Sequence, residues 1–339
     1  MSGSATIFNV GMSIAHSQDN MGRGQSRACV IGIDLGGTKV LAGIADRHGH
    51  VLTTLEQPTY HGESGSVLDQ MVSVIEMLLS DTERSADDLL GVVIGVPAAV
   101  DPRTGLATLS PNLRLPADCS LAELMTGRIG CPVVVENDVN LAAFAEASAW
   151  HSECGGSLVF ISFGTGVGMG LVINGELWRG AFGRAGEIGF LPVGATPHER
   201  APHSENGLYE DAVGTHGIRA RFSAGAETVA DLFASARQGR GEALAAIDEI
   251  ARSASVGLAA VHALLDPSVT VIGGGIGTQV EFFEPLKRHL QALLPFHCRV
   301  EKSRFGARAG MMGALSLALK AAVELSDGRD KHVQIPDRL

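Results

Sequence analysis

The sequence predicts an α/β protein made of two similar lobes, and three features indicate this fold class. Short apolar runs such as 91–97 alternate along the chain with stretches whose apolar residues recur at helical spacing. Two segments, 28–52 and 157–180, each have the pattern of a strand, a glycine-rich turn and a strand, followed by a tight turn and a third strand. The chain of 339 residues is also too long for one ordinary domain.

The two hairpin segments match each other when the first is shifted by 128 positions, which places Asp34 on Ser162 and Gly36 on Gly164. Agreement over a whole hairpin pattern indicates an internal repeat better than a single shared dipeptide does. Two such halves, each opening with a glycine-turned hairpin, describe an actin-like or hexokinase-like ATPase fold with a central cleft between two lobes.

The other elements follow from periodicity and capping signals. Ser120, with Glu123 three residues later, has the pattern of a helix-starting capping box. Because strands alternate with helices, a mainly parallel sheet is expected in each half. Helices are expected over 67–79, 120–130, 241–265, 281–293 and 305–325, and further buried strands over 131–138 and 268–273.

These elements divide the chain into four parts. Residues 1–27 are polar and loose, with no basic stretch ahead of their apolar residues, so a disordered leader is expected rather than a secretory signal. A smaller N-terminal lobe is expected over 28–138, completed by the C-terminal helix at about 305–325. The larger C-terminal lobe covers 139–304, and 326–339 form a tail.

Composition excludes several function classes. With 45% hydrophobic and 19% charged residues, the chain can bury a large core, which argues against disorder as its main state. The formal charge of -11 and the absence of a basic run argue against a nucleic-acid partner. No run of about 18 apolar residues exists, so no membrane span is expected. Five scattered cysteines are typical of a reduced, cytoplasmic protein: Cys29, Cys119, Cys131, Cys154 and Cys298.

The first glycine turn, "DLGGTK", joins two strands and suits phosphate binding. Gly36 and Gly37 let backbone N–H groups point at an anion without obstruction by side chains. Asp34, at the end of the strand, could hold a hydrated Mg²⁺, and Thr38 and Lys39 could donate to phosphate. The alternative is a plain hairpin turn, because short glycine motifs have many false positives.

A second turn of this kind, "FGTGVGMG", occupies the equivalent place in the other half and contains Gly164, Thr165 and Gly166. Two such turns facing across a cleft are harder to dismiss than one, although a repeated structural hairpin remains an alternative. A third glycine segment, 273–277, follows a buried strand. It could pass beneath an adenosine or form a simple tight turn.

Candidate catalytic and binding carboxylates follow from "ENDVN", where a buried strand becomes a helix. Open α/β sheets bind ligands at the carboxyl ends of their strands. Asp138 could accept a proton from a substrate hydroxyl and Asn137 could hydrogen-bond another, although either could merely cap the helix. Glu187 lies in a glycine-flanked loop and Glu210 at the start of a helix, and a single carboxylate in either place is more often solvated or capping than bound to a ligand.

Taken together, the motifs resemble the ROK family, which comprises bacterial sugar kinases and sugar-responsive repressors. The resemblance covers about Cys29 to Leu325 and implies ATP with Mg²⁺, a hexose-type substrate and frequent homodimers. The motifs that carry it, in order, are "DLGGTK", "GVPAAVDPRTG", "SPNL", "ENDVNLAAFAE", "GTGVGMGLVINGELWRG", "GEIG", "VIGGGIG" and "AGMMGAL".

The resemblance also implies residue roles. Asp138 would be the catalytic base, and three glycine segments would bind the nucleotide. The implied sugar contacts are Asn112, Asn137, Glu187 and Glu210; the phosphate contacts are Gly36, Gly37, Thr38, Gly164 and Thr165; the adenosine contacts are Gly274 and Gly275.

One departure from the family pattern concerns a zinc site. The family has GEIGH followed by CxCGxxGCxE, in which the His and three Cys bind zinc and the His also orients the sugar. Here the four positions are Phe190, Ala201, His203 and Leu208, and only the closing Glu210 is retained. Tetrahedral zinc needs four N or S ligands, so no metal site is expected here. The change favours altered sugar preference over lost catalysis.

The leading hypothesis is an ATP-dependent, glucokinase-like sugar kinase. The alternative is a sugar-responsive transcriptional regulator or a non-catalytic sugar-binding protein of the same family. Family repressors carry a winged helix ahead of this domain, and the 33 residues before Asp34 show no convincing amphipathic helix. A repressor-type DNA-binding domain is therefore not expected. The expected partner is a small-molecule sugar, without nucleic acid or membrane.

Overall fold

The computed structural model describes residues 27–61, 64–109, 118–150, 156–222 and 228–326, which form two compact units. Of the described residues, unit 1 contains those up to Val100, those within 104–138 and those from Met311 to Ser326; unit 2 contains 101–103 and those within 139–310. Apart from 101–103, the chain therefore leaves unit 1 after Asp138 and returns to it after Gly310. The expected leader up to residue 26, Asn112, Cys154 and the tail from residue 327 lie outside the described residues.

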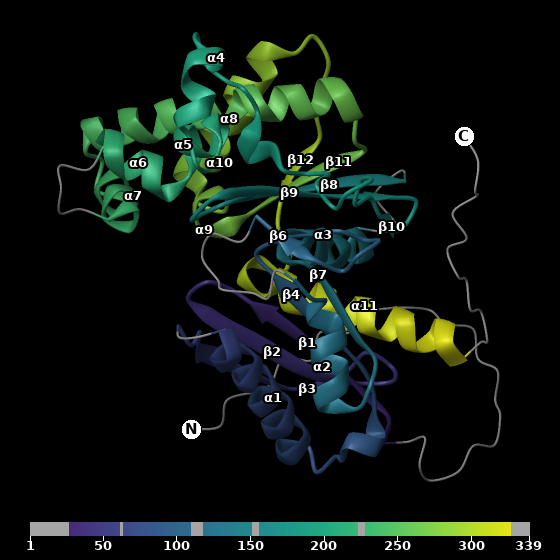
Figure 1. The fold of residues 1–339 in the computed structure, drawn as a ribbon. Helices are drawn as coiled ribbons and strands as arrows, with labels where there is room; N and C mark the ends of the chain where they lie inside the picture. Colours follow the sequence, from purple (N-terminus) through teal and green to yellow (C-terminus); the bar gives the residue numbers. More distant parts are fainter. Residues whose placement is uncertain (1–26, 62–63, 110–117, 151–155, 223–227, 327–339) are drawn as a thin grey trace, which may run out of the picture. The chain divides into compact units, whose positions relative to one another are not determined.

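Unit 1 is built on a five-stranded sheet with the order β3-β2-β1-β4-β7 (Figure 1). The first three strands form antiparallel pairs, and β1, β4 and β7 are parallel. The strands are β1 (Cys29–Leu35), β2 (Lys39–Asp46), β3 (Val51–Pro58), β4 (Leu89–Val96) and β7 (Val133–Asn137), and β5 (Ala99–Val100) pairs with β6 (Ala107–Thr108).

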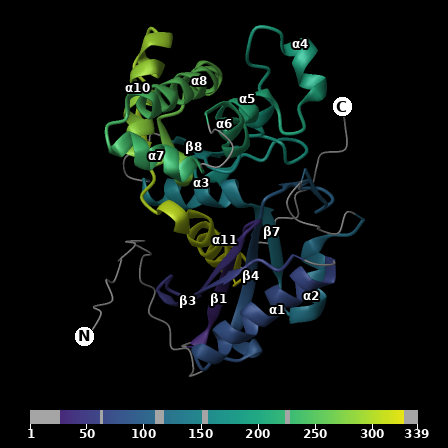
Figure 2. The same cartoon turned by 90° about the vertical axis from the view of Figure 1, so that its left-hand side faces the viewer.

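The two faces of this sheet are covered by different helices (Figure 2). Alternate residues of β1, such as Ile31 and Ile33, belong to one apolar core with α1 (Ser64–Asp81) and α2 (Leu121–Ile129). The opposite face presents Gly32, where an added Cβ would lie 2.6 Å from the backbone nitrogen of Leu315 in α11 (Ala309–Ser326). Glycine thus allows α11 to approach the sheet closely.

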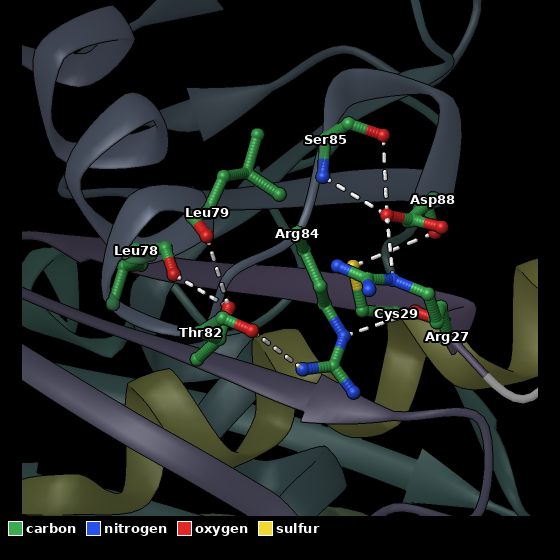
Figure 3. A network of polar contacts seen from close by, with 8 residues as sticks. All are labelled: Arg27, Cys29, Leu78, Leu79, Thr82, Arg84, Ser85 and Asp88. Atoms are coloured by element: carbon green, nitrogen blue, oxygen red, sulfur yellow. Dashed lines mark hydrogen bonds and ion pairs between the residues drawn. The ribbon is translucent and has the colours of Figure 1, made fainter.

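A polar network ties the beginning of β1 to the end of α1 and to the short helix η2 (Ala86–Asp88) (Figure 3). The guanidinium of Arg84 donates to the Arg27 carbonyl at 2.9 Å, and Arg27 pairs with Asp88 at 3.5 Å. Asp88 also accepts from the amide of Ser85 at 2.9 Å, and its carbonyl accepts from the Cys29 thiol at 3.5 Å. These contacts hold the beginning of β1, which is the end of the strand opposite to its glycine turn.

Unit 2 repeats this sheet, with the order β10-β9-β8-β11-β12. Again the first three strands form antiparallel pairs, and the other two pairings are parallel. The expectation of mainly parallel sheets was therefore wrong, because strands joined by short turns must be antiparallel. The strands are β8 (Ser157–Phe163), β9 (Val167–Ile173), β10 (Glu176–Leu177), β11 (Val269–Gly273) and β12 (Val300–Lys302).

One face of the second sheet is covered by α3 (Asp138–Ala149), since an added Cβ at Gly170 would lie 2.6 Å from the Cβ of Ala143. The other face supports the larger helical part, whose apolar side chains form a second core with β8 and β9. Its helices are η3 (Ile188–Phe190), α4 (Pro197–Arg200), η4 (Ala201–His203), α5 (Leu208–Val213), α6 (Thr215–Phe222), α7 (Val229–Arg237), α8 (Gly241–Leu265), α9 (Gly274–Gly277), α10 (Val280–Leu293) and η5 (Gly306–Arg308).

The last helix begins later than the sequence pattern predicts. It was expected from Phe305, whereas α11 begins at Ala309 after the short η5 turn. Gly306 has a φ of 55°, which is left-handed and incompatible with an α-helix. The buried carboxylate of Glu146 also accepts from the amide of Phe305 at 3.2 Å and so holds this segment in place. Within the described part of the chain, no helix is both long and apolar enough to span a bilayer.

Candidate active site

The first glycine turn lies between β1 and β2, with Asp34 one residue before the end of β1. Burial raises the pKa of Asp34 to about 6, and the positive charge of Lys39 offsets this only partly. The Lys39 ammonium itself forms an exposed ion pair with Glu56 at 2.9 Å. A phosphate group would have to compete with Glu56 for this ammonium.

The turn is closed by hydrogen bonds at both ends. The amide of Gly36 donates to the Lys39 carbonyl at 2.9 Å. From outside the turn, the hydroxyl of Thr59 donates to the Gly36 carbonyl at 2.6 Å, and its amide donates to the Thr38 carbonyl at 3.0 Å. Thr59 therefore holds two of the carbonyls of the turn.

Thr59 is itself fixed by Gln70 of α1, a buried side chain with 2% of its surface exposed. The Gln70 amide group donates to the carbonyl of Pro58 at 2.8 Å, and its oxygen accepts from the amide of Tyr60 at 2.9 Å. These two bonds bracket Thr59 on both sides along the chain. The sequence analysis identified neither Thr59 nor Gln70.

The second glycine turn, between β8 and β9, is closed in the same manner. The amide of Gly164 donates to the Gly166 carbonyl at 3.0 Å. The hydroxyl of Thr215, the first residue of α6, donates to the Gly164 carbonyl at 2.9 Å, and its amide donates to the Thr165 carbonyl at 3.0 Å. Both turns thus depend on a threonine distant in the sequence.

Two carboxylates lie beside the second turn. Glu210 of α5 accepts from the amide of Val167 at 2.9 Å, directly after Gly166. Burial raises the pKa of Glu210. The hydrogen bond from Val167 lowers this pKa, and the negative charge of nearby Asp211 raises it. Burial likewise raises the pKa of Glu187, and the negative charge of Glu210 raises it further. The two carboxylates are therefore close enough to interact, as a site for several hydroxyl groups would require.

The helix that carries Glu210 is anchored on both sides of this residue. The hydroxyl of buried Tyr209 donates to the Ala254 carbonyl of α8 at 2.6 Å, and burial raises the pKa of that phenol. On the other side, Asp211 accepts from the hydroxyl of Ser204 at 2.6 Å, and the same hydroxyl accepts from the amide of Gly207 at 2.9 Å. Glu210 is thereby held from both of its neighbours in the sequence.

The positions where the family pattern has zinc ligands differ in how far their side chains are buried. Phe190 is 49% exposed, whereas Leu208 is 4% exposed. Ala201 and His203 are exposed. Among the described residues, no group of three or more His, Cys, Asp or Glu side chains could hold a metal ion. The loop is held by the Ser204 bonds described above and by the packing of Leu208.

Asp138 and Asn137 lie where β7 ends and α3 begins. Asp34 pairs in register with Gly95 of β4, and β4 pairs with β7 in parallel, so both acidic residues occupy the carboxyl edge of one sheet. The Asn137 side chain donates to the Ala98 carbonyl at 3.2 Å. Asp138 also lies in the first turn of α3, where negative charge is favourable to the helix dipole.

The third glycine segment forms the short helix α9 rather than a simple turn. An added Cβ at Gly274 would lie 2.2 Å from the Phe163 carbonyl, and one at Gly164 would lie 3.7 Å from the amide nitrogen of Gly275. This segment therefore lies against the second glycine turn.

The structure thus brings the expected residues together in two groups. In unit 1, the first turn shares a sheet edge with Asp34 and Asp138; in unit 2, the second turn lies with 274–275, Glu187 and Glu210. Thr59, Gln70, Thr215 and Ser204 were not predicted from the sequence. The bonds of Thr59 and Thr215 span 23 and 51 residues, and those of Gln70 and Ser204, although shorter, link residues that belong to no motif.

This duplicated sheet, with a glycine-turned hairpin opening each copy, defines the actin-like and hexokinase-like class of α/β proteins. Solved structures support the same class. A ROK family glucokinase from Streptomyces griseus, in complex with glucose and AMPPNP, matches with a TM-score of 0.71 at 28% identity over 86% of this chain and all of its own. A ROK hexokinase from Thermus thermophilus matches with a TM-score of 0.70 at 28% identity, covering 88% of this chain and 100% of its own.

Sequence comparison gives the family. The ROK family profile matches residues 30–321. The glucokinase of Streptomyces coelicolor is 30% identical over 313 residues, which are 85% of this chain and 96% of its own length. A beta-glucoside kinase of Listeria monocytogenes is 29% identical over 84% of this chain and 96% of its own. The chain belongs to the ROK family, as its motifs suggested.

Proposed function

We propose that this protein transfers the γ-phosphate of ATP to a hydroxyl of a hexose or hexose derivative, with Asp138 as general base. That the chain is an ATP-dependent carbohydrate kinase follows from its family and from relatives that are glucokinases and sugar kinases. The observation that carries the proposal further is the Val167–Glu210 hydrogen bond. It joins a turn suited to phosphate to a carboxylate suited to sugar hydroxyls within one unit.

The nucleotide would be bound by the glycine segments. Backbone N–H groups in a glycine turn form a concave anion site, and Gly36, Gly37 and Thr38 in unit 1 would meet phosphate oxygens in this way. Gly164, Thr165 and Gly166 would do the same in unit 2, and Gly274 and Gly275 would lie along the adenosine.

Asp34 would hold a hydrated Mg²⁺. Mg²⁺ in phosphotransfer sites keeps several waters and takes one or two carboxylates plus phosphate oxygens, which fits a single acid at a strand end. When bound, the ion neutralises charge on the phosphates. The buried setting of Asp34 disfavours its ionised form in the absence of a cation, so a nearby positive ion would restore that form.

The sugar would be bound by acceptors that match its hydroxyl donors. Glu187 and Glu210 in their ionised form accept hydrogen bonds from hydroxyls, and Asn137 and Asn112 would contribute further contacts. Asp138 would accept the proton of the attacking hydroxyl, a role that typically contributes a factor of about 10² to 10⁴ to the rate. We further propose that the protein works in the cytoplasm as a homodimer.

The decisive experiment measures ADP release against a panel of hexoses, N-acetylhexosamines and β-glucosides, with Mg²⁺ present. Sugar-dependent ADP release is expected with at least one of them, together with the phosphorylated sugar by mass spectrometry. A sugar that binds in calorimetry without any ADP release would instead support a non-catalytic sugar-binding protein.

A further inference from the structure

We infer that Thr59 and Thr215 are positioning residues, which orient the two glycine turns so that one amide of each points toward phosphate. The inference rests on the proposed use of ATP. It assigns a role to two residues that belong to none of the glycine motifs and lie outside both turns in the sequence.

In the first turn, the peptide bond between Gly36 and Gly37 is oriented by Thr59. In a trans peptide the carbonyl and the following N–H lie in one plane and point in opposite directions. Thr59 holds the Gly36 carbonyl with its hydroxyl at 2.6 Å. The N–H of Gly37 must therefore point away from Thr59, and among the described residues it has no hydrogen-bond acceptor.

The second turn repeats this arrangement with different elements. Thr215 holds the Gly164 carbonyl at 2.9 Å, so the N–H of Thr165 points away from Thr215. That amide, like the one of Gly37, donates to no other residue in the described part of the chain. Each turn thus presents an oriented donor, which is the requirement for binding a phosphate oxygen.

The two threonines do not occupy equivalent positions in the two units. The shift of 128 that superimposes the turns places Thr59 on Glu187 and Thr215 on Asp87. Thr59 follows β3, whereas Thr215 begins α6. The same hydroxyl-to-carbonyl bond is therefore supplied by different elements in the two units, which indicates a shared requirement of the two turns.

The two positions differ in what else they are connected to. Thr59 is 5% exposed, and its two neighbours in the chain are bonded to Gln70. Thr215 follows Gly214, whose amide donates to the carbonyl of Glu210 at 2.7 Å. A change at Thr215 should therefore also move the Glu210 carboxylate, whereas a change at Thr59 should leave the sugar contacts of unit 2 in place.

The test replaces each threonine with valine, which removes the hydroxyl, and with serine, which keeps it. Kinetic constants for ATP and sugar are measured together with ADP affinity by calorimetry. A lost neutral hydrogen bond corresponds to about a fivefold effect. Thr59→Val should raise KM for ATP and Kd for ADP by about this factor with KM for sugar unchanged, whereas Thr215→Val should raise all three. Thr59→Ser and Thr215→Ser should restore the wild-type values.

Two matched controls separate positioning from general destabilisation. Thr82 donates to the Leu78 carbonyl at 2.8 Å in unit 1, and buried Thr270 bonds His262 at 3.1 Å in unit 2. Thr82→Val and Thr270→Val should lower the melting temperature without changing ADP affinity.

The outcomes distinguish this inference from the proposed function. If the wild type binds ADP and phosphorylates a sugar while both valine variants bind ADP equally well, the positioning role is wrong. Failure of the serine variants to restore ADP affinity also overturns it. If the wild type binds no ADP and releases none from ATP, the proposed function fails and this inference fails with it.

Discussion

The two units share one sheet plan but place their polar side chains differently. Strand order and directions agree, and each sheet has one face approached closely by a single helix at a glycine, α11 over Gly32 and α3 over Gly170. They differ after the hairpin. In unit 1, β3 has 8 residues and leads into α1, whereas in unit 2, β10 has 2 residues and a long helical segment precedes β11.

This difference determines where the acidic side chains lie. In unit 1 they lie at strand ends, since Asp34 is near the end of β1 and Asp138 directly follows β7 as the first residue of α3. In unit 2 the position equivalent to Asp34 is Ser162, and the carboxylates Glu187 and Glu210 come from the inserted segment. The repeated sheet therefore supplies a glycine turn in both units. Under the proposed function, the metal and the catalytic base would be held by unit 1, and most of the sugar hydroxyls would be bound by the carboxylates of unit 2.

The sharpest test of this separation is Asp138→Asn, with Glu187→Gln as its counterpart in unit 2. We expect Asp138→Asn to lower kcat by about 10² to 10⁴ with little change in sugar affinity, because a base acts mainly in the transition state. Glu187→Gln should act mainly on KM for sugar. Near-normal kcat in Asp138→Asn would leave this residue with only a helix-capping role.

A steric change in each turn gives the next largest effect. An added Cβ at Gly166 would lie 2.4 Å from the carboxylate of Glu210, whereas one at Gly36 would meet only the Lys39 carbonyl at 3.0 Å. Gly166→Ala should raise KM for sugar by about 10- to 100-fold, because small displacements of binding groups are costly. Gly36→Ala should act on KM for ATP instead.

Gly241→Ala is the control for both glycine variants, since nothing lies within 4 Å of its added Cβ. Steady-state kinetics with both substrates varied separates the two effects. Equal effects of Gly166→Ala and Gly36→Ala on the sugar constant would contradict the division of roles between the units.

The acid on the first sheet should make stability depend on pH. The pKa of Asp34 is raised from 3.8 to about 6, so its ionisation opposes folding: the protonated form is favoured at low pH, and stability is lost as the pH rises through 6. The loss is at most about 3 kcal/mol. Asp34→Asn should therefore be more stable than the wild type at about pH 8 and similar at about pH 4. Urea unfolding across this range measures it.

Ser162, at the equivalent place in unit 2, has no such titration. Added Mg²⁺ and ATP should stabilise the wild type at high pH but not Asp34→Asn, because a bound cation favours the ionised carboxylate. If the two proteins show the same pH dependence without ligands, Asp34 is not the titrating group.

The smallest expected effect concerns the loop at which the family pattern has its zinc ligands. Ser204→Ala removes the partly buried bond to Asp211 and should cost about 1 kcal/mol of unfolding free energy, with a modest rise in KM for sugar. Ser85→Ala removes the analogous but exposed bond to Asp88 in unit 1 and should leave KM unchanged.

Chelation of zinc should not alter the melting temperature of the protein. A lowered melting temperature that zinc restores and magnesium does not would contradict a metal-free loop.

Local patterns were sufficient to predict the two glycine-turned hairpins and the longest helices, whereas short elements such as β5, β6 and β12 were not predicted. The expected helix over 241–265 coincides with α8, and Ser120 accepts from the amide of Glu123 at the start of α2. The repeat at a shift of 128 led to the two-lobed fold class, which the solved structures of relatives confirm. These features depend on side-chain period and on turn chemistry within a few residues, which the sequence records directly.

Tertiary structure decided the features that depend on which elements meet. The order of the parallel strands, the late start of α11, and the different exposures of Phe190 and Leu208 have no local signature. The same holds for the hydroxyls of Thr59 and Thr215, which reach turn carbonyls 23 and 51 residues away. Sequence determines which backbone groups need a partner, because turns leave them unpaired; only the packed chain determines which side chain comes close enough to supply it.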